Sequence, residues 1–371
     1  MTGARAISTP QGRELLEAAR SGDEVAYERL VEPHRPELHA HCYRMLGSLH
    51  DAEDALQDAL LRAWRGLVRF EGRSSLRSWL YTIATNTCLS LLARRQRRVL
   101  PVDFVPAADA HDGPGEPLVE SVWVEPYPDE KLGLEDGFAA PEARYELRES
   151  VELAFVAAMQ HLPATQRAVL ILREVLGFSA REVAESLEAT VASVNSALQR
   201  ARKAVDERVP EQSQLATLRS LGDDRLREIV EAYMDAMGRG DVNAVVEMLA
   251  DDAAWSMPPL ATWYRGHDEI GVFLTHGPLS GDWRWRHLPA RANGQAAVGC
   301  YTWHAEEDSH LPFALDVLTL DGHQIKQVTA FIARSTDLRD ARDFARWPEY
   351  PPDAAKVVAL FERFGLPSRL D

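Results

Sequence analysis

The feature that most constrains the fold is an apolar spacing within GFSAREVAESLEATVASVNSALQRARKAV, residues 177–205. Apolar residues recur there three and four positions apart, at Val191, Val194, Leu198, Ala201 and Val205. This spacing predicts a helix with one apolar seam. Ser179 followed by Glu182 has the sequence of a capping box, so a preceding helix should start there and run to about Leu187. Two short helices joined by a tight turn are typical of a helix-turn-helix.

The outer face of the second helix is polar and basic and carries no acid. Its residues are Ser193, Asn195, Ser196, Gln199, Arg200, Arg202 and Lys203. Amide, hydroxyl and guanidinium groups in this arrangement suit a helix that enters the major groove of DNA. A helical hairpin with a plain solvated face would show the same pattern, so this motif alone does not establish DNA binding.

A longer amphipathic helix is predicted over HDAEDALQDALLRAWRGL, residues 50–67, because its small and apolar residues follow a helical stripe. The opposite face carries Asp54, Gln57, Asp58 and Leu61. A leucine among acids is often a scattered surface residue, but beside a polar triad it can also anchor a partner helix. The residues alone leave both alternatives open.

Basic residues gather in the next segment, although the whole chain has a formal net charge of −16. Residues 62–98 carry nine arginines and one acid, Glu71. The stretch WLYTIATNTCLSLLARRQRR, residues 79–98, predicts an amphipathic helix that ends in four arginines. Such a surface suits a polyanion, since bases stack on aromatic rings and guanidinium groups hold phosphates. Burial of Trp79 in a core, and cations that only offset a helix dipole, are the structural alternatives.

Composition divides the chain further. Residues 101–150 carry 13 acids and three basic residues, are rich in Pro and Gly and lack a sustained period, which predicts a mostly extended acidic linker. A weaker boundary falls near residues 209–222. With 371 residues, the chain is long enough for two or three domains with real cores.

Several classes of protein are excluded by the sequence. No stretch approaches the length of a membrane span, and MTGARAISTPQGRELL lacks the apolar core of a signal peptide, so we expect a cytoplasmic protein with no membrane partner. Cys42, Cys88 and Cys300 are far apart and predict reduced, buried thiols rather than disulfides. His39, His41 and Cys42 do not indicate a metal site, because positions two apart on a helix face away from each other. No phosphate-binding loop or other cofactor motif appears in the sequence.

The two helical blocks, in this order, resemble extracytoplasmic-function (ECF) RNA polymerase sigma factors. HCYRMLGSLHDAEDALQDALLRAWRGLVRFEGRSSLRSWLYTIATNTCLSLLARRQRR resembles their second conserved region, and HLPATQRAVLILREVLGFSAREVAESLEATVASVNSALQRARKAV resembles their fourth. The resemblance implies a protein that binds core RNA polymerase, at the beta-prime clamp and the beta flap, and directs it to promoter DNA. It also implies that the acidic linker threads the RNA exit path, although a plain solvated spacer remains an alternative.

The resemblance assigns roles to individual residues. Core-polymerase contacts fall on Asp54, Gln57, Asp58 and Leu61. Contacts to the minus-ten element fall on Arg73, Ser74, Ser75, Trp79, Asn86, Arg94, Arg95, Arg97 and Arg98, the arginines holding backbone phosphates. Contacts to the minus-thirty-five element fall on Ser193, Asn195, Ser196, Gln199, Arg200, Arg202 and Lys203. Relatives often have a basic residue at the position of Asn195, which predicts a preference for adenine or a weaker contact there.

The last part of the chain resembles SnoaL-like domains, which are cone-shaped α+β folds. RLREIVEAYMDAMGRGDVNAVVEMLADDAAWSMPPLATWYRG is followed by strand-like runs such as AAVGCYTW and QIKQVTAFI. Together with the first blocks, this resembles sigma factors that carry a fused SnoaL-like domain. The predicted fold is thus multidomain, with two all-α sigma domains followed by an α+β cone. The predicted segments are 11–100 (sigma region 2), 101–150 (linker), 151–209 (sigma region 4), 222–335 (SnoaL-like domain) and 336–371 (tail).

A pocket inside the cone is the remaining functional candidate. Its expected lining is Trp255, Met257, Trp263, Phe313, Asp316 and Val317, although such residues are more often simply core. Acid–base chemistry would need an inward-facing polar group, and the candidates are His287, His304, His310 and Asp316; we expect Asp316 at the surface. We therefore expect no enzyme activity and favour binding of an unidentified small molecule or regulation of the sigma domains in cis. The alternatives are a conventional helix-turn-helix regulator and a SnoaL-type isomerase or hydrolase.

The tail contains a Pro-rich break, RWPEYPP, and then the apolar segment DAAKVVALFERFGLP. A helix with so many apolar residues needs a covering surface. We expect it to pack either on its own domain or on the sigma domains.

Overall fold

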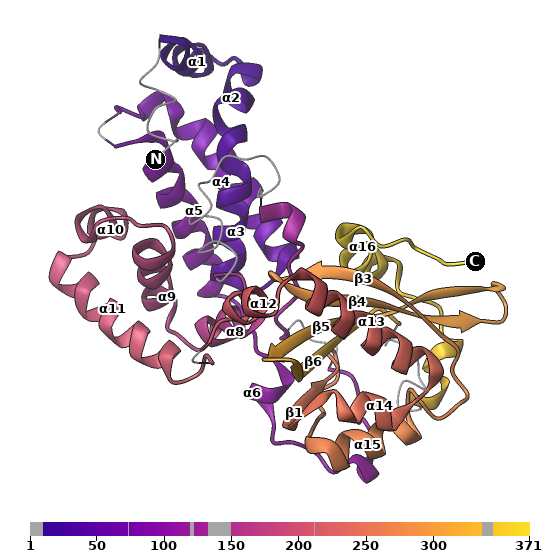
Figure 1. Cartoon of the computed structure of the whole chain (residues 1–371). Helices are drawn as coiled ribbons and strands as arrows, with labels where there is room; N and C mark the ends of the chain where they lie inside the picture. Colours follow the sequence, from indigo (N-terminus) through magenta and orange to yellow (C-terminus); the bar gives the residue numbers. More distant parts are fainter. Residues whose placement is uncertain (1–9, 73, 119–121, 133–149, 211, 336–343) are drawn as a thin grey trace. The chain divides into compact units, whose positions relative to one another are not determined.

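The computed structural model describes residues 10–72, 74–118, 122–132, 150–210, 212–335 and 344–371. The chain forms two units, Met1–Arg98 with Glu130–Glu211, and Val99–Asp129 with Gln212–Asp371 (Figure 1). Each unit therefore joins segments that are distant in sequence. Within the described residues, no helix combines the length and the apolar composition of a membrane span.

The first unit begins with a group of helices. They are α1 (Pro10–Arg20), α2 (Glu24–Val31), α3 (Arg35–Leu46), α4 (Leu49–Gly66) and α5 (Leu76–Leu92). The Ser48 side chain accepts a hydrogen bond from the Asp51 amide and begins α4, and Ser75 does the same for Ser78 at α5. Such N-caps are worth about 1 kcal/mol each. The predicted stripe of α4 is buried, from Ala52 to Ala63.

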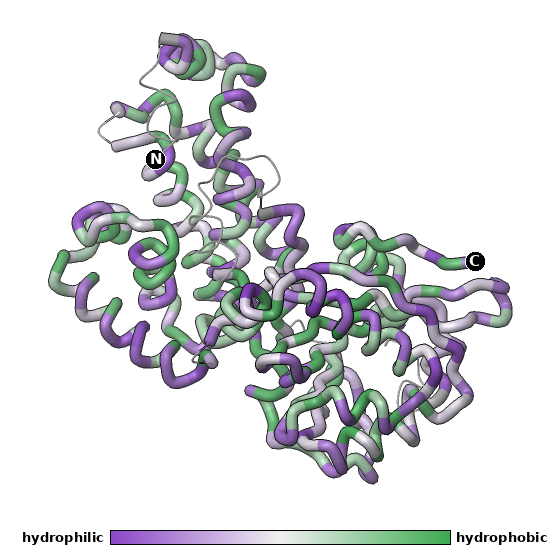
Figure 2. Tube along the Cα trace, viewed as in Figure 1, coloured by the Kyte–Doolittle hydropathy of each residue, from purple (hydrophilic) through white to green (hydrophobic). Residues whose placement is uncertain are grey.

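The helix-turn-helix prediction is confirmed. After α8 (Leu153–Gln160) and α9 (Ala164–Leu170), α10 (Ala180–Ser186) and α11 (Val191–Asp206) follow. The capping box is complete, because Ser179 and Glu182 each bind the other's backbone N–H. The Thr190 side chain caps α11 by accepting a hydrogen bond from the Ser193 amide. In Figure 2, α11 shows both hydrophilic and hydrophobic residues along its length, consistent with its buried apolar seam.

The second unit is built on one mixed sheet. Its strands are β1 (Leu249–Ser256), β2 (Trp263–Arg265), β3 (Trp285–Ala292), β4 (Gln295–His304), β5 (Ser309–Asp321) and β6 (Gln324–Ile332). The order is β2-β1-β6-β5-β4-β3, with β1 and β6 parallel and the other neighbours antiparallel. This sheet with its helices confirms the predicted α+β domain.

Helices pack against this sheet. They are α12 (Gln214–Leu221), α13 (Asp223–Arg239), α14 (Val242–Glu247) and α15 (Gly266–His276). Their apolar sides share a core with the strands that includes Tyr233, Trp255 and Phe273. Trp255 lies with its ring centroid 6.2 Å from that of Phe273, so the helical layer and the sheet meet through aromatic contacts.

The tail packs on its own domain, which settles the alternative that the sequence left open. It contains α16 (Ala354–Leu360), and the ring of Phe361 lies 5.1 Å from that of Tyr301 on β4. A Cβ at Gly299 would lie 2.6 Å from Leu366, so only glycine allows the tail to approach β4 this closely. Gly299 and Tyr301 flank Cys300, which lines the core side of the sheet. Because neighbouring strand residues alternate between faces, the tail covers the other face.

The first part of the acidic linker differs from a free spacer. Residues 99–129 belong to the second unit, where α6 (Pro101–Phe104) and the segments around it run along the SnoaL-like part. The Ala108 and Leu118 amides donate to the carbonyls of Trp263 and Pro259, at 2.9 and 3.0 Å. Residues 119–121 and 133–149 of the predicted linker lie outside the described residues.

Candidate polymerase and promoter interface

The polar face of α4 is exposed as its pattern predicts. Leu61 is 48% exposed, and Asp54 and Gln57 are also exposed. Asp54 lies 3.6 Å from His50, and Asp58 forms an ion pair with Arg62 at 2.7 Å. In each pair the two residues are one helical turn apart and exposed to solvent, so each pair contributes a few tenths of a kcal/mol at most to the stability of the helix. A partner could displace them at little cost, and an exposed leucine beside carboxylates remains available for contact.

The expected minus-ten residues lie at the start and along one side of α5. Ser74, Ser75 and Asn86 are exposed, and Ser75 also caps the helix. Trp79 is half-buried, with its ring 4.9 Å from that of Phe70. The Trp79 ring therefore packs against Phe70 and also remains partly accessible to solvent. Arg73 lies outside the described residues.

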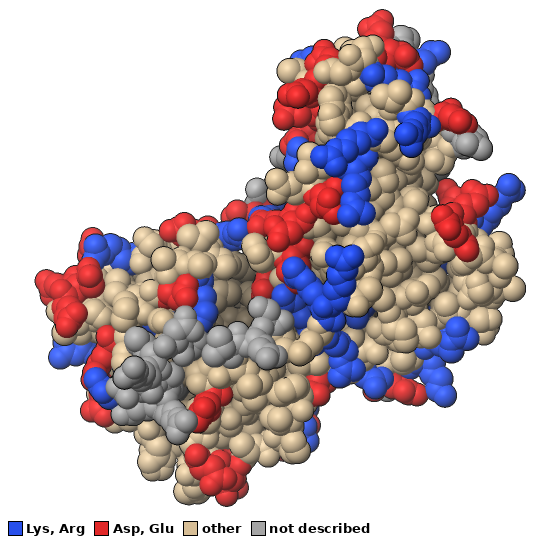
Figure 3. All heavy atoms as spheres, turned by 180° about the vertical axis from the view of Figure 1, so that it is seen from behind, with Lys and Arg blue, Asp and Glu red and all other residues tan. Residues whose placement is uncertain are grey.

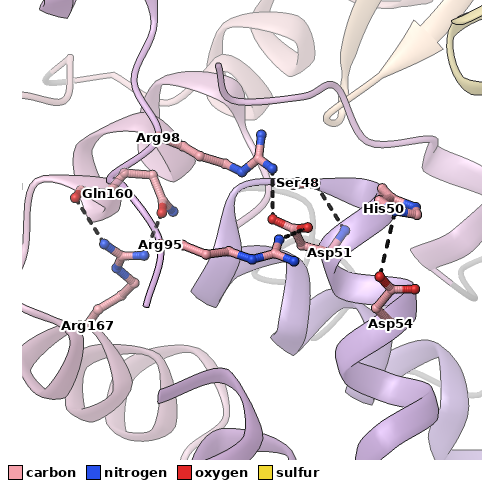
Figure 4. A network of polar contacts seen from close by, with 8 residues as sticks. All are labelled: Ser48, His50, Asp51, Asp54, Arg95, Arg98, Gln160 and Arg167. Atoms are coloured by element: carbon pink, nitrogen blue, oxygen red, sulfur yellow. Dashed lines mark hydrogen bonds and ion pairs between the residues drawn. The ribbon is translucent and has the colours of Figure 1, made fainter. Parts of the chain in front are cut away.

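The arginine run does not continue the helix, which corrects the sequence prediction. Helix α5 ends at Leu92, and residues 94–98 form a turn and an extended segment. Arg95 and Arg98 turn back to the buried carboxylate of Asp51 in the first turn of α4 (Figure 4). The Arg98 contact measures 2.7 Å, and Arg98 is only 7% exposed.

Opposite charges meet in this cluster. Burial by itself would raise the pKa of Asp51, but the hydrogen bonds and charges of Arg95 and Arg98 outweigh it and hold that pKa below the usual range. The prediction that Arg98 holds a DNA phosphate therefore does not fit this structure, because its guanidinium already neutralises a buried carboxylate. Arg94 and Arg97 are exposed and keep the geometry that a phosphate contact needs.

Asp51 is the residue that sequence reasoning missed. It stands in an acid-rich helix start, where an acid is expected to complement the helix dipole. No local signal relates it to arginines more than 40 positions away. Only the packing of α5 beside α4 brings the two segments together.

The outer face of α11 is accessible as predicted. The seven expected residues, Ser193, Asn195, Ser196, Gln199, Arg200, Arg202 and Lys203, are all exposed. Arg202 forms an ion pair with Glu174 at 2.7 Å, and the Ser193 hydroxyl donates to the Thr190 carbonyl at 2.8 Å. Figure 3 shows basic and acidic side chains interspersed on one face of the molecule.

The cone encloses only a small cavity, of about 30 Å³. Trp255, Met257, Phe313 and Asp316 line it as expected, whereas Trp263 and Val317 do not. Trp263 instead donates from Nε1 to the carbonyl of Val105 at 2.7 Å. Typical ligand pockets measure about 300 to 1,000 Å³, so in this arrangement the cavity has room for about one water molecule.

Asp316 is buried, contrary to the expectation of a surface position. It is 2% exposed and accepts hydrogen bonds at Oδ2 from the Tyr233 hydroxyl, at 2.8 Å, and from the Cys300 thiol, at 3.3 Å. Burial raises the pKa of Asp316 to about 6, and the two hydrogen bonds oppose that rise. A carboxyl group is therefore present in the cone, but it is satisfied by its own neighbours.

The three histidine candidates do not join this carboxyl group. His287 stacks on Trp285, and burial lowers its pKa to about 4. His304 lies 3.2 Å from the Glu349 carbonyl, and His310 packs edge-on against Trp303. None of the three lines the cavity, so the described residues do not assemble an acid–base pair there.

Comparison with known proteins places these sites in a family. Residues 30–98 match the Sigma-70 region 2 family, residues 152–205 match Sigma-70 region 4, and residues 230–335 match the SnoaL-like domain. A helical unit with these two matched regions and a fused SnoaL-like domain defines a sigma factor.

Similarity over nearly the whole chain identifies the family of sigma factors more narrowly. The chain is 43% identical over 373 residues to the ECF RNA polymerase sigma factor SigG of Mycobacterium tuberculosis, covering 95% of this chain and 89% of that protein. It is 30% identical to the ECF RNA polymerase sigma-E factor of Escherichia coli over 53% of this chain and 92% of that protein. The crystal structure of the ECF sigma factor SigJ of M. tuberculosis matches 84% of this chain and 97% of that chain, with a TM-score of 0.49 and 22% identity.

The chain therefore belongs to the extracytoplasmic-function RNA polymerase sigma factors. It is an alternative sigma factor with a C-terminal SnoaL-like domain.

Proposed function

We propose that this sigma factor contacts the beta-prime clamp of core RNA polymerase through Asp54, Gln57, Asp58 and Leu61. The observation that carries this assignment is the exposure of Leu61 beside weakly held carboxylates, above an apolar stripe that is buried. An exposed leucine surrounded by polar groups has the composition of a small hot spot with a polar rim. The sigma region 4 domain would then meet the beta flap.

The promoter contacts are proposed on two surfaces. The exposed residues of α5 and its cap, with Arg94 and Arg97, would hold the minus-ten element, and the outer face of α11 would read the minus-thirty-five element. That face of α11 carries Arg200, Arg202 and Lys203 and one acid, Asp206, so a phosphate backbone meets an excess of positive charge there. Transcription by bacterial core enzyme takes place in the cytoplasm, so we place the protein there.

We also propose that the SnoaL-like domain regulates the sigma domains in cis and is not an enzyme. Residues 99–129 lead from the sigma region 2 domain toward the sigma region 4 domain, and the SnoaL-like part holds them by hydrogen bonds. Asn293 and Tyr127 exchange two of these bonds, the Tyr127 amide donating to Asn293 Oδ1 at 2.9 Å and the Asn293 amide donating to the Tyr127 carbonyl at 2.8 Å. A cavity of about 30 Å³, whose two titratable lining residues Asp316 and Cys300 are hydrogen-bonded to each other, gives little support to catalysis.

The polymerase contact is tested by co-purification with core enzyme. The double variant Asp58→Ala and Leu61→Ala should bind core polymerase more weakly and keep the melting temperature of the parent, because the buried stripe is untouched. The matched control is Val25→Ala with Glu28→Ala, which removes an exposed aliphatic residue and an exposed acid from α2 and should bind normally. Equal recovery of core with both variants would refute the assignment.

The cis-regulation is tested in the full-length chain. Asn293 has a φ of 57°, so Asn293→Gly removes its side chain without straining the backbone. We expect release of the linker and a higher rate of run-off transcription with core enzyme. Asn243→Gly, at an exposed position of α14, is the control. Truncations that end near residues 209, 335 and 350 form a second series, and unchanged core binding and transcription throughout would contradict regulation by this domain.

A further inference from the structure

Val191 stands apart from the apolar seam of α11 in which its spacing places it. It is 44% exposed, whereas Val194 and Leu198 are 1% and 6% exposed, and Ala201 and Val205 are buried as well. Packing of the helix therefore accounts for the last four positions of the seam and not for the first. A single exposed valine is common on protein surfaces, so its surroundings decide whether it has a function.

The start of α11 holds the Val191 side chain in a defined position. Val191 is the first residue of the helix, and Thr190 caps it by accepting a hydrogen bond from the Ser193 amide at 3.1 Å. The Cα–Cβ bonds of a helix tilt toward its first residues, so this side chain projects beyond the start of α11. A valine in a helix also keeps essentially one χ1 rotamer. Its two methyl groups are therefore presented in a fixed arrangement and lose little conformational freedom on binding.

The turn before α11 closes on α10 and leaves Val191 open. Glu188 reverses the chain with a φ of 51°, and the Ala189 amide donates to the Ala184 carbonyl of α10 at 2.8 Å. Helix α11 then follows α10 (Figure 1), with Ala192 exposed beside Val191. A ligand that approaches the outer face of α11 can thus reach Val191 without any rearrangement of the turn.

Val191 begins a row of exposed side chains that continues with Asn195 and Gln199. The three residues are four positions apart, which places them on one face of α11. All three are exposed, and the two amides belong to the surface proposed to read the minus-thirty-five element. The valine is therefore continuous with that surface and extends it to the first residue of the helix, where recognition helices contact base edges.

The chemistry of this row matches the major-groove edges of A·T base pairs. The amides of Asn and Gln pair bidentately with N6 and N7 of adenine, and apolar side chains contact the 5-methyl group of thymine. Cytosine lacks that methyl group, so an apolar side chain distinguishes the two pyrimidines. Four residues of a helix rise about 6 Å, which is less than two base-pair steps of about 3.4 Å each. Val191 and Asn195 therefore address base pairs that are adjacent or next but one.

We propose that Val191 reads a thymine of the minus-thirty-five element by contact of its methyl groups with the 5-methyl group of that base. The thymine lies within two base pairs of an adenine read by Asn195. This specificity contact rests on the proposed function of the outer face of α11 and adds to it the kind of base that the first residue selects. Contact of Val191 with polymerase, instead of DNA, is the alternative that the experiments separate.

The first test removes the methyl group from the DNA. In a promoter located by sequencing run-off transcripts, each thymine of the minus-thirty-five element, on either strand, is replaced singly with deoxyuridine, which keeps the base pairing. Burial of one methyl group corresponds to about a fourfold change in a binding constant. One replacement should therefore weaken binding of the parent holoenzyme about fourfold. Deoxyuridine in the spacer between the two promoter elements is the control and should leave binding unchanged.

The second test removes the methyl groups from the protein. Val191→Ala should weaken binding to the thymine promoter by about the same factor and should no longer respond to deoxyuridine. Alanine is the better helix former, so the melting temperature should not fall. The matched control is Val25→Ala, at a valine of α2 that is 64% exposed, which should bind and respond as the parent does.

Three results would overturn the thymine contact. They are a minus-thirty-five element without thymine, a parent holoenzyme that responds to none of the replacements, and a Val191→Ala holoenzyme that responds as strongly as the parent. Equal weakening by Val191→Ala on every promoter, with no response to deoxyuridine in the parent, would assign Val191 to polymerase.

Gln199→Ala separates this proposal from the proposed function on which it rests. If α11 reads the minus-thirty-five element, Gln199→Ala should reduce the preference of the holoenzyme for the native element over a scrambled one. An unchanged preference would contradict the assignment of α11 itself. A reduced preference without any effect of deoxyuridine would overturn the role of Val191 alone.

Discussion

The arginines after α5 form two pairs for which we predict different effects of substitution, one on the salt dependence of promoter binding and the other on stability. Arg94 and Arg97 are exposed, whereas Arg95 and Arg98 neutralise Asp51. Replacing Arg94 and Arg97 with Gln should remove up to two phosphate contacts and leave the fold unchanged. Each phosphate contact contributes about 0.7 to the salt slope on single-stranded DNA and about 0.9 on duplex DNA, so the slope of holoenzyme–promoter binding should fall by about 1.4 to 1.8.

Replacing Arg95 and Arg98 with Gln should affect stability instead. Asp51 would be left as a buried carboxylate without a cation, a loss of about 3 to 5 kcal/mol. The low end applies because Arg95 is 44% exposed and water can replace part of its contribution. For a unit of this size, about 3 kcal/mol corresponds to a melting temperature about 6 to 12 °C lower.

The two pairs are compared in the same assays. Promoter binding by the reconstituted holoenzyme is measured from low to moderate salt, and thermal unfolding of the free chain is followed by circular dichroism. The reasoning is refuted if the Arg95 and Arg98 variant lowers the salt slope as much as the Arg94 and Arg97 variant, or if its melting temperature equals that of the parent.

Three further predictions concern other buried groups. The pKa of Asp51 is lower in the folded protein than in the unfolded chain. Its contribution to the free energy of unfolding is therefore present above the usual aspartate pKa of about 4 and is lost as the pH falls through the lower folded value. The free energies of unfolding of the parent and of Asp51→Asn, measured in urea, should converge in acid. The pH dependence of stability has the opposite sign at Asp316, because its folded-state pKa is raised to about 6. Its stabilising effect is complete below pH 4 and is lost as the pH rises through 6. Asp316→Asn should abolish this dependence. The Tyr127 amide should exchange its hydrogen slowly in the parent and much faster in Asn293→Gly, and equal rates would show that Asn293 does not hold this segment.

Local chemistry determined much of this protein from the sequence alone. The capping box at Ser179, the Thr190 cap and the apolar seam of α11 act within a few residues of one another, so the helix-turn-helix could be predicted with its turn in place. The stripe of α4 likewise dictates which face is buried and leaves Leu61 outside. The order of the two sigma blocks and the SnoaL-like part is carried by linear motifs, and comparison with known proteins confirmed it.

Contacts between distant segments were decided only by the tertiary structure. Asp51 and Arg98 are separated by about four helical turns of α4, a loop and the whole of α5, and no periodicity relates their side chains. Apolar residues stand on both sides of Asp316 and at both parities along the strand, so the sequence pattern does not say which face it occupies. The donors Tyr233 and Cys300, from α13 and β4, supply the hydrogen bonds that its buried carboxyl group needs.

The acidic linker shows the same limit most clearly. Its acidic, Pro- and Gly-rich composition predicted a mostly extended linker, and the resemblance placed it in the RNA exit path, with a plain solvated spacer as the alternative. Its backbone hydrogen bonds, however, are satisfied by Pro259, Trp263 and Asn293, more than 100 residues later. Net charge describes how a segment interacts with solvent and ions, whereas its place in a fold depends on which unpaired backbone groups another segment presents, and only the folded chain brings those groups together.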